Sequence, residues 1–90
     1  MTTRKGVAMS PNDKKLFDLL EEILLIDENR YRDEYGPDEI ETWDSLATVN
    51  IAAAVGKTFG YAMPPEQMAE LESIGDIRRA LRSAGIALDP

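Results

Sequence analysis

The chain contains neither cysteine nor histidine, and this limits both how it can fold and what it can catalyse. Without cysteine it has no disulfide, no thiolate zinc site and no thiol nucleophile. Without histidine it lacks the usual general base, a common zinc ligand and any Ser-His-Asp triad. Its 90 residues suffice for one domain, so we expect one small apolar core and no second domain. We do not expect a self-sufficient enzyme or a metal site.

The net charge of −7 is unevenly distributed along the sequence. Residues 1–15 carry +3, residues 16–45 carry −9 and residues 46–90 carry −1. An acidic chain lacks the basic stripe that phosphate contacts need, which argues against nucleic-acid binding and favours partners with basic surfaces. The acidic block can also be explained as a loop kept solvated by its like charges.

The apolar runs are too short to cross a membrane, since the longest covers five residues, from Ile51 to Val55. Arg4 and Lys5 are not followed by an apolar segment, so we do not expect a secretory signal. These features favour a cytoplasmic protein, and we expect a monomer.

Apolar residues recur at helical spacing and predict an all-α fold. The first helix should begin at Ser10-Pro11 and run to about Ile26, with Leu16, Leu20, Ile23 and Leu24 facing inward. The other expected helices are residues 46–59 with Ser45 as N-cap, 65–71 after Pro64-Pro65-Glu66, and a last one from Ile74, capped by Ser73, to a stop at Gly85. The sequence therefore predicts a four-helix bundle with a short third helix.

The predicted ends of the domain follow from the same pattern. We expect a flexible N-terminal segment at residues 1–9, the domain at residues 10–84 and a C-terminal tail at residues 85–90. The last helix has Ile74, Ile77 and Leu81 on its inner face. Its three arginines should offset the helix dipole at its C-terminal end: Arg78, Arg79 and Arg82.

Residues 27–43 form a long loop between the first two helices, with Gly36-Pro37 as a turn signal and no sustained apolar face. Loops of this length in a small domain are usually functional or disordered. Ile40 and Trp43 should anchor the end of the loop to the core. The loop does not match a calcium-binding loop, because its sixth position is arginine rather than glycine.

Ser45 is the candidate functional residue, in the sequence Trp43-Asp44-Ser45-Leu46. It lies between the acidic loop and an apolar helix. A hydroxyl at the start of a helix is close to free backbone N–H groups and to the positive end of the dipole, so it suits a phosphate-bearing group. The alternative is a plain helix-capping serine.

An acidic chain of this length, with four helices, a long first loop and Asp-Ser-Leu opening the second helix, resembles the acyl carrier protein family over about residues 10–84. The resemblance implies that a separate transferase attaches 4′-phosphopantetheine from coenzyme A to Ser45, and that Asp44 and Leu46 belong to the recognition motif. The thiol of this arm would carry acyl chains as thioesters for enzymes of fatty-acid, polyketide or related specialised biosynthesis. The arm would supply the thiol and the partner enzymes would supply the bases. This agrees with a chain that lacks cysteine and histidine.

Further matches to the family are an aromatic residue at the end of the second helix, Phe59, and the proline-rich start of the third. The Trp43-Asp44-Ser45-Leu46 form looks more like stand-alone carriers of specialised pathways than the Gly-Ala-Asp-Ser-Leu of the fatty-acid carrier. The chain also lacks the Gly-Gly that usually precedes the serine of peptidyl carriers. An aminoacyl, peptidyl or D-alanyl carrier stays open as an alternative, as does an unmodified acidic helical adaptor.

Residues 46–65 contain no Asp or Glu, and Lys57 is their only charge. By helical position, five residues form the stripe that would face partners: Leu46, Val49, Asn50, Ala53 and Lys57. We expect the transferase, an acyl- or aminoacyl-loading enzyme and downstream enzymes to dock through apolar contacts here, while Asp44 and the preceding acids steer their basic surfaces. The alternative is that Val49 and Ala53 merely complete the core.

Overall fold

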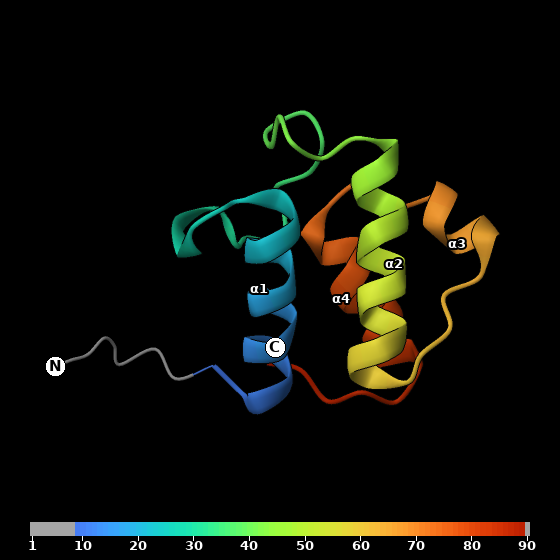
Figure 1. Cartoon of the computed structure of the whole chain (residues 1–90). Helices are drawn as coiled ribbons and strands as arrows, with labels where there is room; N and C mark the ends of the chain where they lie inside the picture. Colours follow the sequence, from blue (N-terminus) through green and yellow to red (C-terminus); the bar gives the residue numbers. More distant parts are fainter. Residues whose placement is uncertain (1–8, 90) are drawn as a thin grey trace, which may run out of the picture.

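The structure is a computed structural model that describes residues 9–89, and within that range it is entirely helical apart from loops and turns (Figure 1). Its elements are α1 (Pro11–Leu24), the 3₁₀ turn η2 (Glu28–Arg30), α2 (Ser45–Phe59), α3 (Pro65–Ala69) and α4 (Ile74–Ser83). The predicted all-α, four-helix architecture with a short third helix is confirmed. The predictions for residues 1–8 lie outside the described residues.

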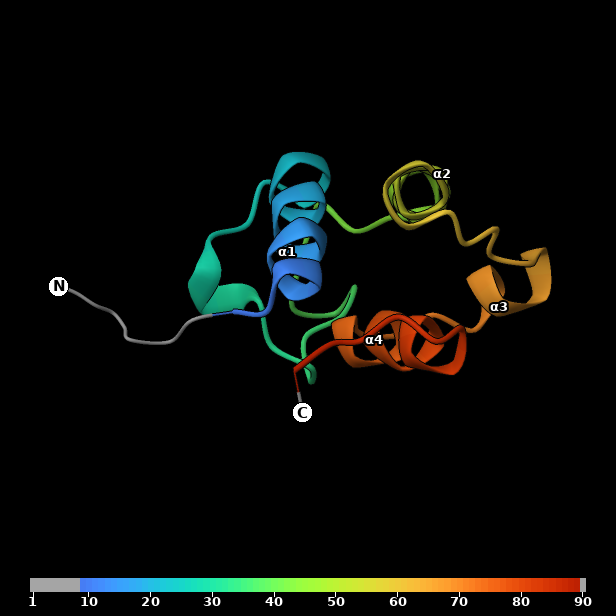
Figure 2. The ribbon, with the colours of Figure 1, turned by 90° about the horizontal axis from the view of Figure 1, so that it is seen from below.

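The helices form two layers (Figure 2). α1 and α2 lie side by side in one layer and run in opposite directions, while α4 crosses on the other side and α3 lies at the edge beside α2. Apolar side chains from both layers and from the loop form the core: Leu16, Leu20, Leu24, Ile40, Ile51, Val55, Ile74, Ile77 and Leu81. The predicted inner faces of α1 and α4 are therefore confirmed, although Ile23 is only half-buried.

α1 ends two residues earlier than the sequence predicts. Its start is as expected, since the Ser10 hydroxyl accepts the Asp13 N–H at 3.2 Å. At its end, Leu25 adopts the left-handed conformation with φ 58° and ψ 40°, and its N–H donates to the Glu21 carbonyl. Glycine or asparagine usually holds this position, so the sequence carries no signal for the stop.

The long loop is anchored to the core, because Ile40 and Trp43 are both buried as predicted. Between these anchors and η2, the loop also contacts the start of α4. The Ile74 N–H donates to the Tyr35 carbonyl at 2.8 Å. Gly36, next along the loop, passes so close to the backbone that a Cβ there would overlap the Glu72 carbonyl oxygen.

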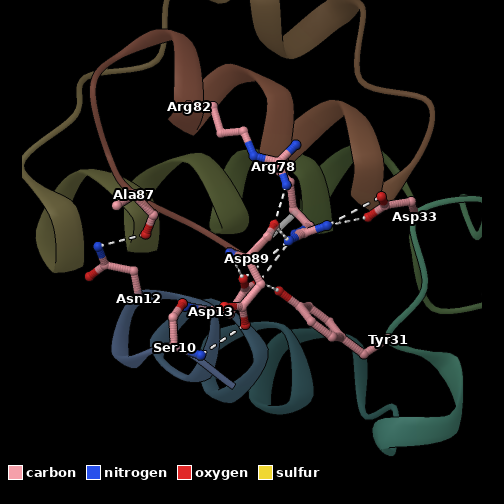
Figure 3. Close-up of polar contacts among 9 residues, drawn as sticks. All are labelled: Ser10, Asn12, Asp13, Tyr31, Asp33, Arg78, Arg82, Ala87 and Asp89. Carbon is pink, nitrogen blue, oxygen red and sulfur yellow. Dashed lines mark hydrogen bonds and ion pairs between the residues drawn. The ribbon is translucent and has the colours of Figure 1, made fainter. Parts of the chain in front are cut away.

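The sequence predicted that Arg78 offsets the dipole at the C-terminal end of α4, and this prediction is wrong. The Arg78 side chain instead points into the protein (Figure 3). Its guanidinium pairs with both carboxylate oxygens of Asp13, with Nε to Oδ1 and Nη2 to Oδ2 each at 3.1 Å. Nη1 also donates to Asp33 Oδ1 at 2.9 Å. Asp13 and Arg78 are the two buried charged residues among those described, so a bidentate ion pair joins α1 to α4.

Two further hydrogen-bond donors contact the Asp13 carboxylate. The Tyr31 hydroxyl donates to Oδ1 and the Asp89 N–H to Oδ2, both at 2.6 Å. Burial alone would raise the pKa of Asp13, but hydrogen bonds from Tyr31, Arg78 and Asp89, with the Arg78 charge, hold it below its ordinary value. Burial and the adjacent Asp13 raise the pKa of Tyr31. Asp13 is therefore expected to be ionised at neutral pH in the folded state.

The segment after α4 returns to α1 (Figure 3). The Ser10 N–H donates to Asp89 Oδ2 at 2.8 Å, and Asn12 Nδ2 donates to the Ala87 carbonyl at 2.9 Å. Ile86 and Leu88 are partly buried against the core. The described part of residues 85–90, which we expected to form a tail, thus contacts the domain, while the domain limits at residues 10 and 84 stay a prediction.

Within residues 9–89, no helix is long and apolar enough to span a membrane. The same residues include no group of three or more acidic, cysteine or histidine side chains placed to hold a metal ion.

Candidate functional site

The N-cap of α2 is Asp44, so the prediction of Ser45 as N-cap is wrong by one position. Asp44 has an extended backbone, and its Oδ1 accepts the Ala47 N–H at 2.8 Å. A carboxylate is a stronger acceptor than a hydroxyl and is favoured at the positive end of the helix dipole. Ser45 is therefore the first residue of the helix, and its side chain is not needed for capping.

The Ser45 hydroxyl differs from those of the serines that begin α1 and α4. Ser10 and Ser73 each accept a backbone N–H, from Asp13 at 3.2 Å and from Asp76 at 3.1 Å. Ser45 is exposed, and no hydrogen bond within residues 9–89 engages its Oγ. Its hydroxyl is thus open to reaction with a group brought from outside.

A buried tryptophan supports the first turn of α2. The Trp43 indole Nε1 donates to Thr48 Oγ1 at 2.9 Å, and Thr48 Oγ1 contacts the Asp44 carbonyl at 3.3 Å. A buried indole N–H requires an acceptor, and Thr48 supplies it from the next helical turn. Hydrogen bonds thereby link Asp44 and Thr48, on either side of Ser45, to the buried Trp43.

An open cleft of about 340 Å³ lies beside Ser45. The first turn of α2 forms one wall with Trp43 and Thr48, and Met68 and Leu71 come from α3 and the residues after it. The exposed hydroxyl, this cleft and the outward N–H groups of the first helical turn fit a phosphate ester with a flexible arm.

The outer face of α2 is apolar and exposed. Leu46 is 67% exposed and Val49 is 56% exposed, although large apolar side chains are normally buried. Asn50, Ala53 and Lys57 are exposed as well. The alternative in which Val49 and Ala53 complete the core is therefore wrong.

The inner face of α2 includes Ala47, which the sequence analysis did not identify as a core residue. Ala47 is buried together with Ile51 and Val55, and these three recur at intervals of four residues. That spacing was the available signal, but alanine alone is a weak indicator of burial. The predicted partner-facing stripe and the buried stripe thus lie on different sides of the helix.

Comparison with known protein families matches the segment that contains Ser45. Residues 43–81, from Trp43 to Leu81, match the family model of the phosphopantetheine attachment site. A search of the curated proteins found no match. Members of this family carry covalently attached 4′-phosphopantetheine.

The fold, the exposed serine and this match support a phosphopantetheine-carrying carrier protein. The match over residues 43–81 is consistent with the resemblance to carriers of the acyl carrier type that the sequence indicated. Domains of this family work with separate enzymes, including the transferase that attaches the arm.

Proposed function

We propose that the protein is an acyl carrier protein in which Ser45 bears 4′-phosphopantetheine and delivers acyl thioesters to separate enzymes of fatty-acid, polyketide or related specialised biosynthesis. The observation that carries the proposal is the exposed Ser45 hydroxyl, which makes no hydrogen bond within residues 9–89 and lies inside the matched segment. The arm supplies the reactive thiol that the chain lacks. A tethered substrate also has a raised effective concentration at each partner's active site.

The chain's own residues would prepare Ser45 for modification by a transferase. Asp44 caps the helix and leaves the serine hydroxyl free. In the transfer, Ser45 Oγ forms the new bond to phosphorus, its proton goes to a base of the transferase, and the adenosine bisphosphate half of coenzyme A leaves. The partner is the expected source of this base, because the chain has no histidine and the neighbouring Asp44 carboxylate accepts the Ala47 N–H.

An aminoacyl, peptidyl or D-alanyl carrier is the alternative within the same family. The absence of Gly-Gly before Ser45 favours acyl cargo. Incubating the modified protein with acyl-adenylating and amino-acid-adenylating enzymes would separate the two, because the cargo is read directly as a mass increase on the arm.

Co-expression with a promiscuous phosphopantetheinyl transferase should add the mass of one phosphopantetheinyl group to the wild-type chain. Ser45→Ala should abolish this gain completely, because the accepting oxygen is removed. Ser73→Ala is the matched control: it also removes a helix-start serine and should lower stability by about 1 kcal/mol, yet keep the modification. Intact-mass spectrometry measures all three. No gain in the wild type would favour an unmodified adaptor, and a gain in Ser45→Ala would refute the site.

We further propose that partner enzymes dock on the exposed stripe of α2 through Leu46 and Val49, with Asp44 and the acidic loop steering the approach. Leu46→Glu should lower the rate of acyl transfer to a partner by about tenfold, because a charge would be buried at the interface. The helical circular-dichroism signal should not change, since Leu46 is exposed. Thr58→Glu, an exposed α2 position outside the stripe, is the control; equal transfer rates in both variants would rule out this docking surface.

A further inference from the structure

Leu25 is unfavourable in both its backbone conformation and its exposure. It is the one non-glycine residue with positive φ among residues 9–89, at 58°. A Cβ makes the left-handed conformation costly for a leucine, and glycine would occupy it freely. Its side chain is also 78% exposed, the highest value among the large apolar residues described. Neither helix termination nor core packing therefore explains a leucine at this position.

Leu25 follows the end of α1 that lies next to the start of α2. The Thr42 hydroxyl, three residues before Ser45, donates to the Leu24 carbonyl. Figure 1 shows the C-terminal end of α1 and the N-terminal end of α2 at the same end of the molecule, and Figure 2 shows both helices in one layer. The exposed Leu46 is the second residue of α2, at that end. Exposed apolar side chains thus lie just after α1, at Leu25, and in the first turn of α2, at Leu46, at the end of the molecule that bears Ser45.

The charge around Leu25 indicates what could bind there. Residues 21–29 contain four carboxylates and no lysine or arginine. All four are exposed: Glu21, Glu22, Asp27 and Glu28. α2 contributes no carboxylate after Asp44. The complementary surface is therefore an apolar pocket with a basic rim on the side that faces Leu25.

We propose that Leu25 is a docking contact for the phosphopantetheinyl transferase, which receives it in an apolar pocket rimmed by lysine or arginine while it contacts α2. The inference rests on the proposed function of Ser45. The strained conformation is retained because glycine, the better residue for this helix end, would remove the contact. Leu25 touches no reacting atom, so it acts in binding and not in the chemical step.

Leu25→Gly tests this inference because its effects on stability and on binding should have opposite signs. We expect the thermal midpoint to rise, since the left-handed conformation suits glycine. With coenzyme A and a promiscuous transferase, KM for the variant should rise about tenfold while kcat stays unchanged, because only binding of the carrier is lost. Raising the salt concentration should increase the wild-type KM, because it screens the acidic rim.

Leu25→Met is the matched control, because it keeps an apolar side chain of similar volume at the same backbone position; its KM should stay within about twofold of wild type. A KM for Leu25→Gly equal to that of wild type would overturn the inference while leaving the proposed function intact. Failure of the wild-type chain itself to accept the group would instead overturn the proposed function.

Discussion

Replacing Arg78 with methionine should destabilise the fold by about 3–5 kcal/mol, because Asp13 would keep a buried negative charge without its partner. This is a large share of the total stability of a small domain, about 5–15 kcal/mol. Contacts from Arg78 to Asp33 and to the Asp89 carbonyl would be lost at the same time. Urea unfolding followed by circular dichroism measures the change.

Two further variants separate the buried pair from a general effect of removing arginine. Arg79→Met changes the neighbouring residue, whose side chain is 70% exposed, and should stay within about 0.5 kcal/mol of wild type. Asp13→Asn combined with Arg78→Met should recover part of the lost stability, because no charge is then left unpaired. If Arg78→Met unfolds at the same urea concentration as Arg79→Met, the ion pair does not stabilise the fold as described.

The lowered pKa of Asp13 gives the same network a pH dependence. A carboxyl whose folded-state pKa is depressed contributes stability above its ordinary value of 3.8 and loses it as the pH falls through the folded pKa. Wild-type stability should therefore fall at acid pH. The fall should be smaller in the double variant, because its asparagine side chain does not titrate as the Asp13 carboxyl does.

Replacing Gly36 with alanine should cost about 3 kcal/mol, at the upper end of the range for overpacking. The added Cβ would overlap the Glu72 carbonyl, and backbone atoms cannot rotate away as a side chain can. The loop would have to separate from the start of α4. Because the next residue, Pro37, lines the cleft beside Ser45, we also expect slower modification of the variant.

The matched control is Gly56→Ala, within α2. There the new Cβ would lie 3.6 Å from the nearest atom, the Tyr61 carbonyl oxygen, and alanine favours the helix, so stability should rise by about 0.5–1 kcal/mol. Both variants are compared by thermal unfolding. A Gly36→Ala protein as stable as wild type would show that the loop does not pack against Glu72.

The helices were predictable because their signals are local. Apolar spacing predicted the inner faces of α1 and α4, and the serines at positions 10 and 73 marked two helix starts. The start of α2 was misplaced by one residue because Asp44 and Ser45 are both good capping residues, and the sequence does not say which one accepts the N–H.

The buried charge network was not predictable from local patterns. Asp13 and Arg78 are 65 positions apart, and each has an adequate local explanation, as an acid in a first helical turn and a base near a helix end. Their pairing depends on how α4 crosses α1, which no short window of sequence contains. The conformation of Leu25 was missed for a related reason, since leucine is among the residues least expected there.

The candidate site itself was predictable in identity but not in geometry. The Asp-Ser-Leu context singled out Ser45, and helical position alone identified the outward stripe with Leu46 and Val49, both of which are exposed. The structure added the free hydroxyl and the cleft beside it, since these depend on Asp44 taking the cap and on α3 approaching α2.

Counting thiols tests the carrier function most directly, because the chain contains no cysteine and any thiol must come from an attached arm. After reaction with coenzyme A and a phosphopantetheinyl transferase, followed by removal of free coenzyme A, the wild-type protein should titrate with one thiol per chain and Ser45→Ala with none. A wild-type protein without a thiol, or an equal thiol count in the two proteins, would contradict the assignment of Ser45 as the attachment site.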